Sequence, residues 1–116
     1  MRRTLNRADR IRSWRDFVRV FRQGRCRSDG RLRVHVLANG LGRRRVGIAL
    51  SRRHGNAVRR NRLKRICREA FRTSRDRLPD GRDYVLVPAA GVRMTSRQLR
   101  ESLLRLVRRF DAGARP

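Results

Sequence analysis

The segment RRHGNAVRRNRLKRICREAFR, from Arg52 to Arg72, contains most of the residues in this chain whose type and spacing suggest chemistry. Arginine dominates it, and it also holds the only lysine of the chain, Lys64, and a single acid, Glu69. Guanidinium groups are planar, permanently charged donors that suit phosphate oxygens. The segment therefore indicates anion binding, provided that a regular element holds its cations in fixed positions.

The apolar residues inside this segment predict a helix. Gly55 breaks the preceding strand, and Asn56 is a suitable N-cap for a helix that runs to about Thr73. A stripe with helical spacing would face the core and consists of Leu63, Ile66, Cys67, Ala70 and Phe71. The opposite side carries Asn61, Arg65, Arg68 and Arg72, with Arg62 on one flank and Arg60 and Lys64 on the other.

The charge balance favours a polyanionic partner over a merely solvated helix face. Like charges four residues apart destabilise a helix by a few tenths of a kcal/mol, roughly, per pair, and only Glu69 is available to offset them. The whole chain has 34 basic and 9 acidic residues and a net charge of +25, so neutralising phosphates would release many counterions. Backbone N–H groups at Gly55 and Asn56 would add phosphate donors.

Membrane association is not indicated. The chain has no apolar run of about 18 residues and no apolar signal-peptide segment. We expect a soluble, cytoplasmic protein without a membrane partner.

No catalytic or metal-binding set is evident. Asp76, Asp80 and Asp83 come closest to a carboxylate group, but they lie in a turn-rich segment where aspartate is common for backbone reasons. The two cysteines, Cys26 and Cys67, lack metal-ligand spacing, and Cys67 is expected to be a buried thiol. We expect no catalytic residue in this chain, no metal, and no cofactor bound by the protein alone.

The remaining elements predict one α+β domain over residues 1–116, with helices packed on a single sheet. Ser13 should cap a helix that stops near Gly24 and whose apolar stripe is Trp14, Phe17, Val18 and Phe21. Alternation predicts strands over 32–36 and 46–50, joined by a turn at Asn39-Gly40. A further strand covers 83–88, and a helix with a Thr95/Gln98 capping box runs to about Phe110. Residues 1–12 are expected to form a basic arm and residues 111–116 a frayed tail.

Two features suggest contact with unpaired RNA. The strand over 46–50 has one face of small residues, Gly47, Ala49 and Ser51, which leaves room for close approach to the backbone. Phe17, Phe21 and His35 could stack on bases, although the two phenylalanines fit a core role slightly better, since they share a stripe with Trp14 and Val18. Sequence-specific DNA reading is disfavoured, because the cationic helix follows strands and not another helix of a helix-turn-helix unit.

The run GNAVRRNRLKRICREAFR strongly resembles the signature of the bacterial ribonuclease P protein family. Its hallmark is Arg60-Asn61-Arg62, followed by Lys64-Arg65 and Arg68-Glu69. RDFVRVFRQG is similar to the first helix of that family, and RVGIALSRRHGNAV to its strand-to-helix entry. DYVLVP and the final helix also fit, so the resemblance covers roughly residues 5–110.

The resemblance implies an α/β sandwich with one four-stranded sheet, in the order α-β-β-β-α-β-α, and a left-handed crossover at the motif helix. It also implies the protein subunit of a ribonucleoprotein endoribonuclease, which helps a catalytic RNA remove the 5′ leader of precursor tRNA. In that family the RNA subunit holds the Mg²⁺ ions. The partners would be the catalytic RNA and precursor tRNA.

The same resemblance assigns site residues by position. A cleft for the single-stranded leader would be lined by Phe17, Phe21, His35, Arg52 and Arg53. The RNA subunit would be contacted by Arg60, Asn61, Arg62, Lys64, Arg65 and Arg68. His35 departs from the family, which often has an aromatic residue there. Two other functions stay open: a structural RNA-binding protein of the ribosomal type, and a nuclease that acts with Mg²⁺ and no RNA subunit.

Overall fold

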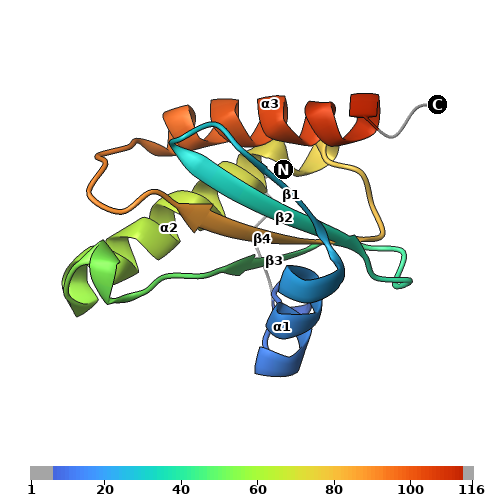
Figure 1. The fold of residues 1–116 in the computed structure, drawn as a ribbon, viewed down its shortest axis with the longest axis horizontal. Coiled ribbons are helices and arrows are strands. Elements are labelled where there is room, and N and C mark those ends of the chain that lie inside the picture. The colour runs from blue at the N-terminus through green and yellow to red at the C-terminus, as the bar shows by residue number, and fades with distance from the viewer. Residues whose placement is uncertain (1–6, 114–116) are drawn as a thin grey trace.

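The computed structural model describes residues 7–113 and forms one four-stranded mixed sheet with three α-helices (Figure 1). The helices are α1 (Trp14–Gln23), α2 (Ala57–Ser74) and α3 (Ser96–Gly113). The strands are β1 (Arg25–Ser28), β2 (Leu32–Ala38), β3 (Arg45–Ile48) and β4 (Arg82–Pro88). The α-β-β-β-α-β-α order and the α+β class predicted from the sequence are confirmed. No helix among residues 7–113 is both long and apolar enough to cross a membrane.

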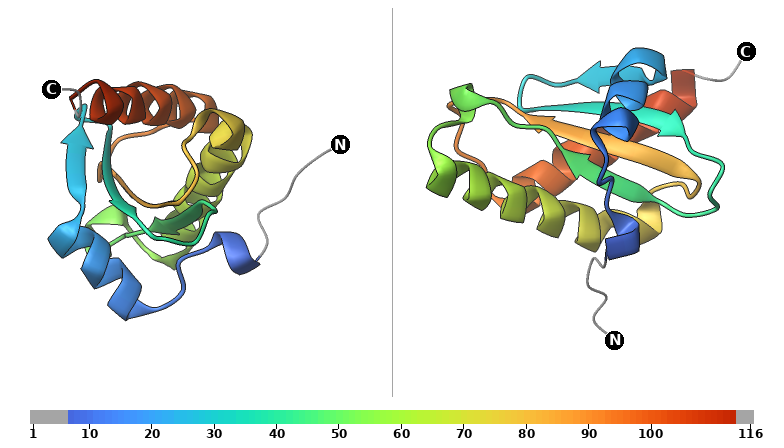
Figure 2. Two further views of the ribbon diagram at one scale, coloured as in Figure 1. Left: turned by 90° about the vertical axis from the view of Figure 1, so that its right-hand side faces the viewer. Right: turned by 90° about the horizontal axis from the view of Figure 1, so that it is seen from below.

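The sheet has the strand order β1-β2-β4-β3. β2 pairs antiparallel with β1 and β4, whereas β3 pairs parallel with β4. Figures 1 and 2 show α1 on one face of the sheet and α2 with α3 on the other. When β3 and β4 point upward and α1 faces the viewer, β4 lies to the right of β3 and α2 passes behind the sheet. The β3-α2-β4 connection is therefore left-handed, against the usual preference.

Local sequence explains where the helices begin. The Ser13 side chain accepts the Asp16 N–H at 3.1 Å, and the Asn56 side chain accepts the Arg59 N–H at 3.0 Å. Thr95 and Gln98 form the expected reciprocal capping box. At the end of α1, a side chain on Gly24 would lie 2.5 Å from the Val20 carbonyl oxygen, so only glycine permits the direct turn into β1.

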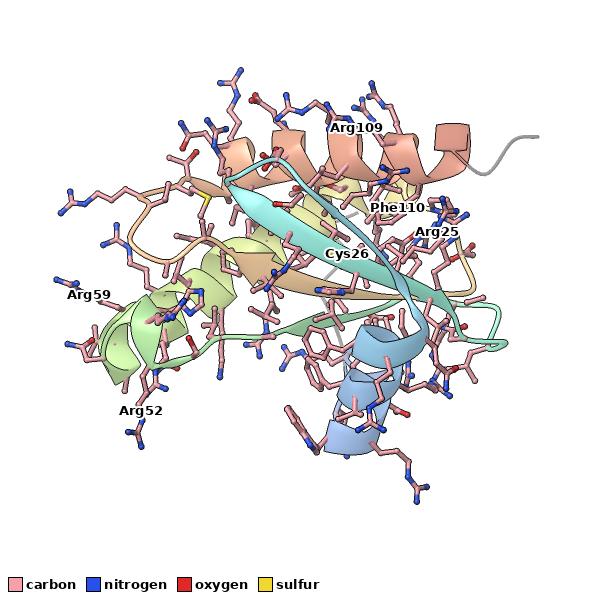
Figure 3. All side chains as sticks on the ribbon, in the orientation of Figure 1. Arg25, Cys26, Arg52, Arg59, Arg109 and Phe110 are labelled. Carbon is pink, nitrogen blue, oxygen red and sulfur yellow. The ribbon has the colours of Figure 1, made fainter. Side chains whose placement is uncertain are left out.

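β1 is a short edge strand whose residues are all exposed, and it docks on α3 through side chains. The Arg25 guanidinium lies 5.7 Å from the centre of the Phe110 ring (Figure 3). At the β1–β2 turn, the Asp29 carboxylate accepts the backbone N–H groups of Arg31 and Leu32, each at 3.0 Å. It also pairs with Arg105 of α3 at 3.1 Å.

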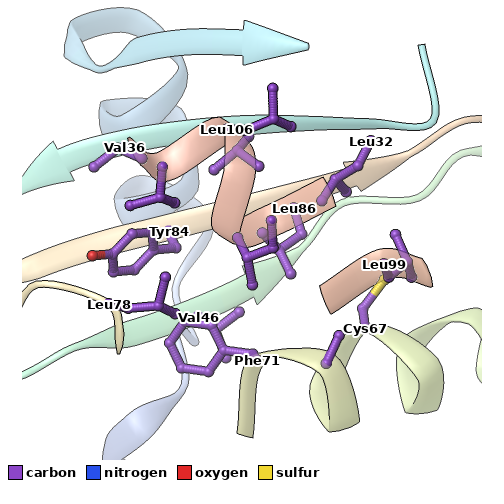
Figure 4. Close-up of a cluster of buried hydrophobic side chains, with 14 of the residues drawn as sticks. Leu32, Val36, Val46, Cys67, Phe71, Leu78, Tyr84, Leu86, Leu99 and Leu106 are labelled. Carbon is purple, nitrogen blue, oxygen red and sulfur yellow. The ribbon is translucent and has the colours of Figure 1, made fainter. Parts of the chain in front are cut away.

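The main core lies between the sheet and the α2–α3 pair (Figure 4). Phe71 and Tyr84 are fully buried there, and the Tyr84 hydroxyl donates to the Pro79 carbonyl at 2.7 Å. Cys67 is buried in the same cluster, as predicted, and burial raises the pKa of its thiol to about 12. A smaller cluster under α1 contains Ile11, Val20 and Val85.

The structure corrects three sequence predictions. The expected arm over 1–12 is wrong for residues 7–12, which form a short 3₁₀ turn and then pair with β3; the Ile11 N–H donates to the Val46 carbonyl at 2.9 Å. Burial of Ile11 explains this docking. Residues 1–6 of that arm lie outside the described residues. The strand predicted over 46–50 ends at Ile48, and α3 continues past Phe110 to Gly113, into the tail that was expected to fray.

Candidate nucleic-acid interface

A groove of about 900 Å³ opens on the α1 face of the sheet. α1 forms one wall, and the turn before α2 together with the first two turns of α2 forms the other. Ala49 of the segment after β3 and Val87 of β4 lie on its floor. The groove therefore runs between an aromatic wall and a cationic wall.

The aromatic wall consists of Trp14, Phe17 and Phe21, one helical turn apart along α1. Phe17 and Phe21 are half-buried and pack on the small cluster, and both also line the groove. Trp14 was expected in the same core stripe, but its side chain is 75% exposed. It lies 6.4 Å from Phe17, centre to centre, with the rings inclined by 27°. The first residue of α1 thus extends the aromatic wall beyond the sheet.

Gly47 does not form an open floor, contrary to the sequence interpretation. A Cβ placed there would lie 2.6 Å from two carbons of the Phe17 ring. Because Gly47 has no side chain, the Phe17 ring packs directly on its backbone and occupies the space that the sequence analysis left for a ligand. Ala49 and Ser51 remain along the groove.

The cationic wall is formed by Arg60, Asn61 and Lys64, which face the groove, and by Arg53 in the preceding turn. That turn is held by His54, whose Nδ1 accepts the Ser51 N–H at 3.0 Å and whose Nε2 lies 2.7 Å from the Pro88 carbonyl. The carbonyl can only accept, so Nε2 carries the proton and donates. His54 therefore links the turn before α2 to the end of β4.

The structure places three of the five predicted cleft residues along the groove, namely Phe17, Phe21 and Arg53. His35 lies beside the groove and not in its lining, with its ring edge-on to Phe21 at 4.7 Å. Burial, followed by repulsion from Arg33, lowers the pKa of His35. Arg52 is exposed and points away from the body of the domain (Figure 3).

The six predicted RNA-subunit residues are divided among three sides of α2. Arg60, Asn61 and Lys64 face the groove, and Arg62 faces a smaller pocket on the opposite flank. Arg65 is exposed on the outer side. Arg68 is half-buried, and its pKa is lowered by burial and then by repulsion from Arg10. Arg72, which the helical pattern aligned with these cations, is bound by Glu69 through bonds of 2.9 and 2.6 Å.

A buried ion pair fixes α1 relative to the sheet. The Asp83 carboxylate of β4 receives hydrogen bonds of 2.8 and 2.7 Å from Arg45 and one of 2.9 Å from Asn39. Burial alone would raise the pKa of Asp83, but these bonds outweigh it and the pKa is lowered. Arg45 also reaches Asp16 of α1 at 3.4 Å.

Asp83 is thus structural and does not join Asp76 and Asp80 in a carboxylate cluster. Among residues 7–113, no three His, Cys, Asp or Glu side chains gather as metal ligands.

A basic α+β domain with an aromatic groove beside a cationic helix defines a small RNA-binding protein. Residues 5–111 match the model of the family described as Ribonuclease P. The chain belongs to the ribonuclease P protein family, whose members are the protein subunits of ribonuclease P in tRNA processing.

Named relatives cover almost the whole chain. The ribonuclease P protein component of Pelotomaculum thermopropionicum is 37% identical over 104 residues, which are 89% of this chain and 93% of that protein. The component of Thermotoga maritima is 35% identical, covering 96% of this chain and 99% of that protein.

Solved structures agree with this assignment. The RNase P protein of Thermotoga maritima superposes with a TM-score of 0.78 at 36% identity and covers 86% of this chain and 96% of that chain. The Staphylococcus aureus RNase P protein gives a TM-score of 0.77 at 28% identity, covering 90% and 96%.

Proposed function

We propose that this protein binds the single-stranded 5′ leader of precursor tRNA in the groove between α1 and α2, while a catalytic RNA subunit cleaves the leader. The protein acts in the cytoplasm and contributes no catalytic residue. Mg²⁺ is held by the RNA subunit, and the protein lowers the phosphate repulsion that opposes its binding.

One observation carries this proposal: the groove of about 900 Å³ has aromatic stacking surfaces on one wall and cations on the other. Unpaired bases stack on aromatic rings with little sequence preference, and the backbone of the strand follows a basic wall. Phe17 and Phe21 supply the stacking surfaces, while Arg60 and Lys64 supply the cations. A double helix keeps the faces of its bases stacked on one another and leaves none free for the aromatic wall, so the groove suits a single strand.

The outer side of α2 supports contact with a second RNA. Arg65 is exposed, and Arg68 is crowded by Arg10, so a phosphate placed there would relieve the repulsion that lowers the pKa of Arg68. Substrate and catalytic RNA would then lie on adjacent sides of one helix. A rigid helix sets the distance between them, which is how the protein would position the leader relative to the cleavage site.

The decisive experiment measures 5′ cleavage of precursor tRNA with the protein alone, with the catalytic RNA alone and with both, using leaders of increasing length. We expect cleavage by the RNA at high Mg²⁺, a lower Mg²⁺ requirement with the protein present, and tighter binding as the leader lengthens to fill the groove. Cleavage by the protein alone would identify a self-sufficient nuclease. Equal binding of precursor and mature tRNA would instead favour a general structural RNA-binding protein.

A further inference from the structure

A second hollow lies on the other flank of α2, away from the groove. It encloses about 350 Å³ and is bounded by the turn before α2, the first turns of α2 and the loop between β4 and α3. Arg53 and His54 separate it from the groove, because both border the two hollows. Arg53 and Arg62, which line it, were assigned above to the leader cleft and to the RNA subunit, but the pocket itself has been given no role.

Four arginines surround the pocket, and no acid borders it. They come from three segments and are Arg53, Arg59, Arg62 and Arg93. Among residues 7–113, the ion pairs given by the structure are made by other arginines, such as Arg45, Arg75 and Arg105. An anion in the pocket would therefore have cations and no acidic side chain among its neighbours.

The backbone at Gly55 lies against the side chain of Arg59, one of these four arginines. Gly55 has φ +100°, and a Cβ there would lie 2.7 Å from Cδ of Arg59. The aliphatic stem of Arg59 therefore lies against Gly55 at the border of the pocket. Figure 3 shows Arg59 at the end of α2 farthest from Arg109.

The base of the pocket is apolar. Leu63 and Ile66 of α2 and Met94 of the following loop line it, and Val92, 43% exposed, lies at its rim. A free phosphate would gain nothing from these side chains, whereas a nucleobase would bury its faces against them. Ligand pockets commonly enclose about 300–1,000 Å³, so this one suits a single nucleotide and not a longer segment.

We infer that this pocket binds one unpaired nucleotide of an RNA strand, with the base against Leu63, Ile66 and Met94 and the phosphate among the arginines. If the groove takes the leader, the strand in this pocket belongs to the catalytic RNA; this last assignment rests on the proposed function. α2 then separates two RNA strands, with Arg60 and Lys64 toward one and Arg59 and Arg62 toward the other.

The test uses the full chain labelled with ¹³C at the methionine methyl groups. The sequence has only Met1 and Met94, and a Met94→Leu variant assigns the signals. The protein is titrated with uridine 5′-monophosphate, ribose 5-phosphate and inorganic phosphate. We expect the mononucleotide to shift the Met94 signal and to bind at least about fivefold more tightly than the two ligands without a base. A static Met94 signal, or equal affinity for all three ligands, would overturn the inference.

Paired charge variants separate this pocket from general attraction to a basic surface. Arg59→Gln with Arg93→Gln should weaken mononucleotide binding by about tenfold, because two charge-assisted hydrogen bonds are lost. Arg108→Gln with Arg109→Gln removes the same charge from exposed positions on α3 and should change the affinity less than about twofold. Equal losses in the two double variants would refute the pocket. Because no catalytic RNA is present, the result is independent of whether the protein supports tRNA cleavage.

Discussion

The ring of Phe17 lies directly on the backbone of Gly47, so that a single added methyl group at that glycine would come within 2.6 Å of two ring carbons. This contact sets how closely α1 approaches the sheet, and α1 is the aromatic wall of the groove. The width of the groove therefore depends on a glycine that has no side chain to contact a ligand.

Gly47→Ala should push Phe17 outward and destabilise the domain by about 1–3 kcal/mol, as overpacked cores commonly do. Leader binding should weaken as well, because the aromatic wall is displaced. Urea unfolding and the affinity for a short single-stranded RNA measure the two effects. Gly40→Ala provides a comparison: its Cβ would meet nothing within 4 Å, although its φ of +70° adds local strain, so affinity should not change. Unaltered affinity in Gly47→Ala would contradict the proposed link between this contact and the groove.

Trp14 gives a direct signal for occupancy of the groove, because it is the only tryptophan in the chain. Its indole is 75% exposed and adjoins Phe17, so a stacked base should quench its fluorescence. Trp14→Ala should reduce affinity for single-stranded RNA by about 1–3 kcal/mol, the usual range for one stacked base, and leave stability nearly unchanged.

Trp14→Phe and Leu41→Ala serve as controls for this prediction. The phenylalanine retains a stacking surface, and Leu41 is an exposed apolar residue outside the groove lining. Both should bind more tightly than Trp14→Ala. If single-stranded RNA binds tightly without any change in Trp14 fluorescence, the strand lies elsewhere.

The sequence predicts the local elements well because their signals are local. Ser13, Asn56 and Thr95 make side-chain hydrogen bonds to backbone groups only three residues away, and each marks a helix start that the structure confirms. The apolar stripe of α2 likewise needs nothing beyond helical spacing. The same spacing does not give the state of each residue on the opposite face: Arg65 is exposed there, but Arg68 is half-buried and Arg72 is bound by Glu69.

Contacts between segments that are distant in the sequence could not be predicted in this way. β1 has no alternation, since its residues are all exposed, and it exists because β2 offers an unpaired edge. The helical period places Trp14 in the same apolar stripe as Phe17, but in the fold Trp14 is 75% exposed. Ile11 pairs with β3 through a hydrogen bond from its backbone N–H to the Val46 carbonyl, and no local sequence pattern predicts this bond. The pocket beside Arg59 is assembled from segments as distant as Arg53 and Arg93, so only the fold brings its cations together.

The outer cations of α2 should determine the salt dependence of binding to the catalytic RNA. Arg65→Gln with Arg68→Gln should weaken assembly and lower the slope of log affinity against log salt by roughly two, one for each lost phosphate contact. Arg72→Gln is the matched control on the same helix, because Glu69 already binds that guanidinium and its contribution should be well below one contact. A slope that stays the same in the double variant would exclude these residues from the interface.

Asp29 should make the stability of the domain sensitive to acid. Burial opposes its ionisation, but hydrogen bonds from the backbone N–H groups of Leu32 and Arg31 and from the Arg105 guanidinium outweigh burial and lower its pKa from 3.8 to about 2. A carboxyl group whose pKa is lower in the folded than in the unfolded state stabilises the fold above the unfolded pKa. That contribution is lost as the pH falls from about 4 toward 2. Asp29→Asn, which keeps an oxygen acceptor for the turn, should therefore be clearly destabilising at pH 6 and much less so at about pH 3.

Urea unfolding of both proteins at the two pH values measures this difference. Glu101→Gln is the matched control, because the Glu101 carboxylate is mostly exposed and its pair with Arg97 is 3.7 Å long. Its effect should be small at both pH values. If Asp29→Asn costs the same stability at pH 3 as at pH 6, the charge on Asp29 does not hold the β1–β2 turn against α3, and the hydrogen bonds that Asn retains are sufficient.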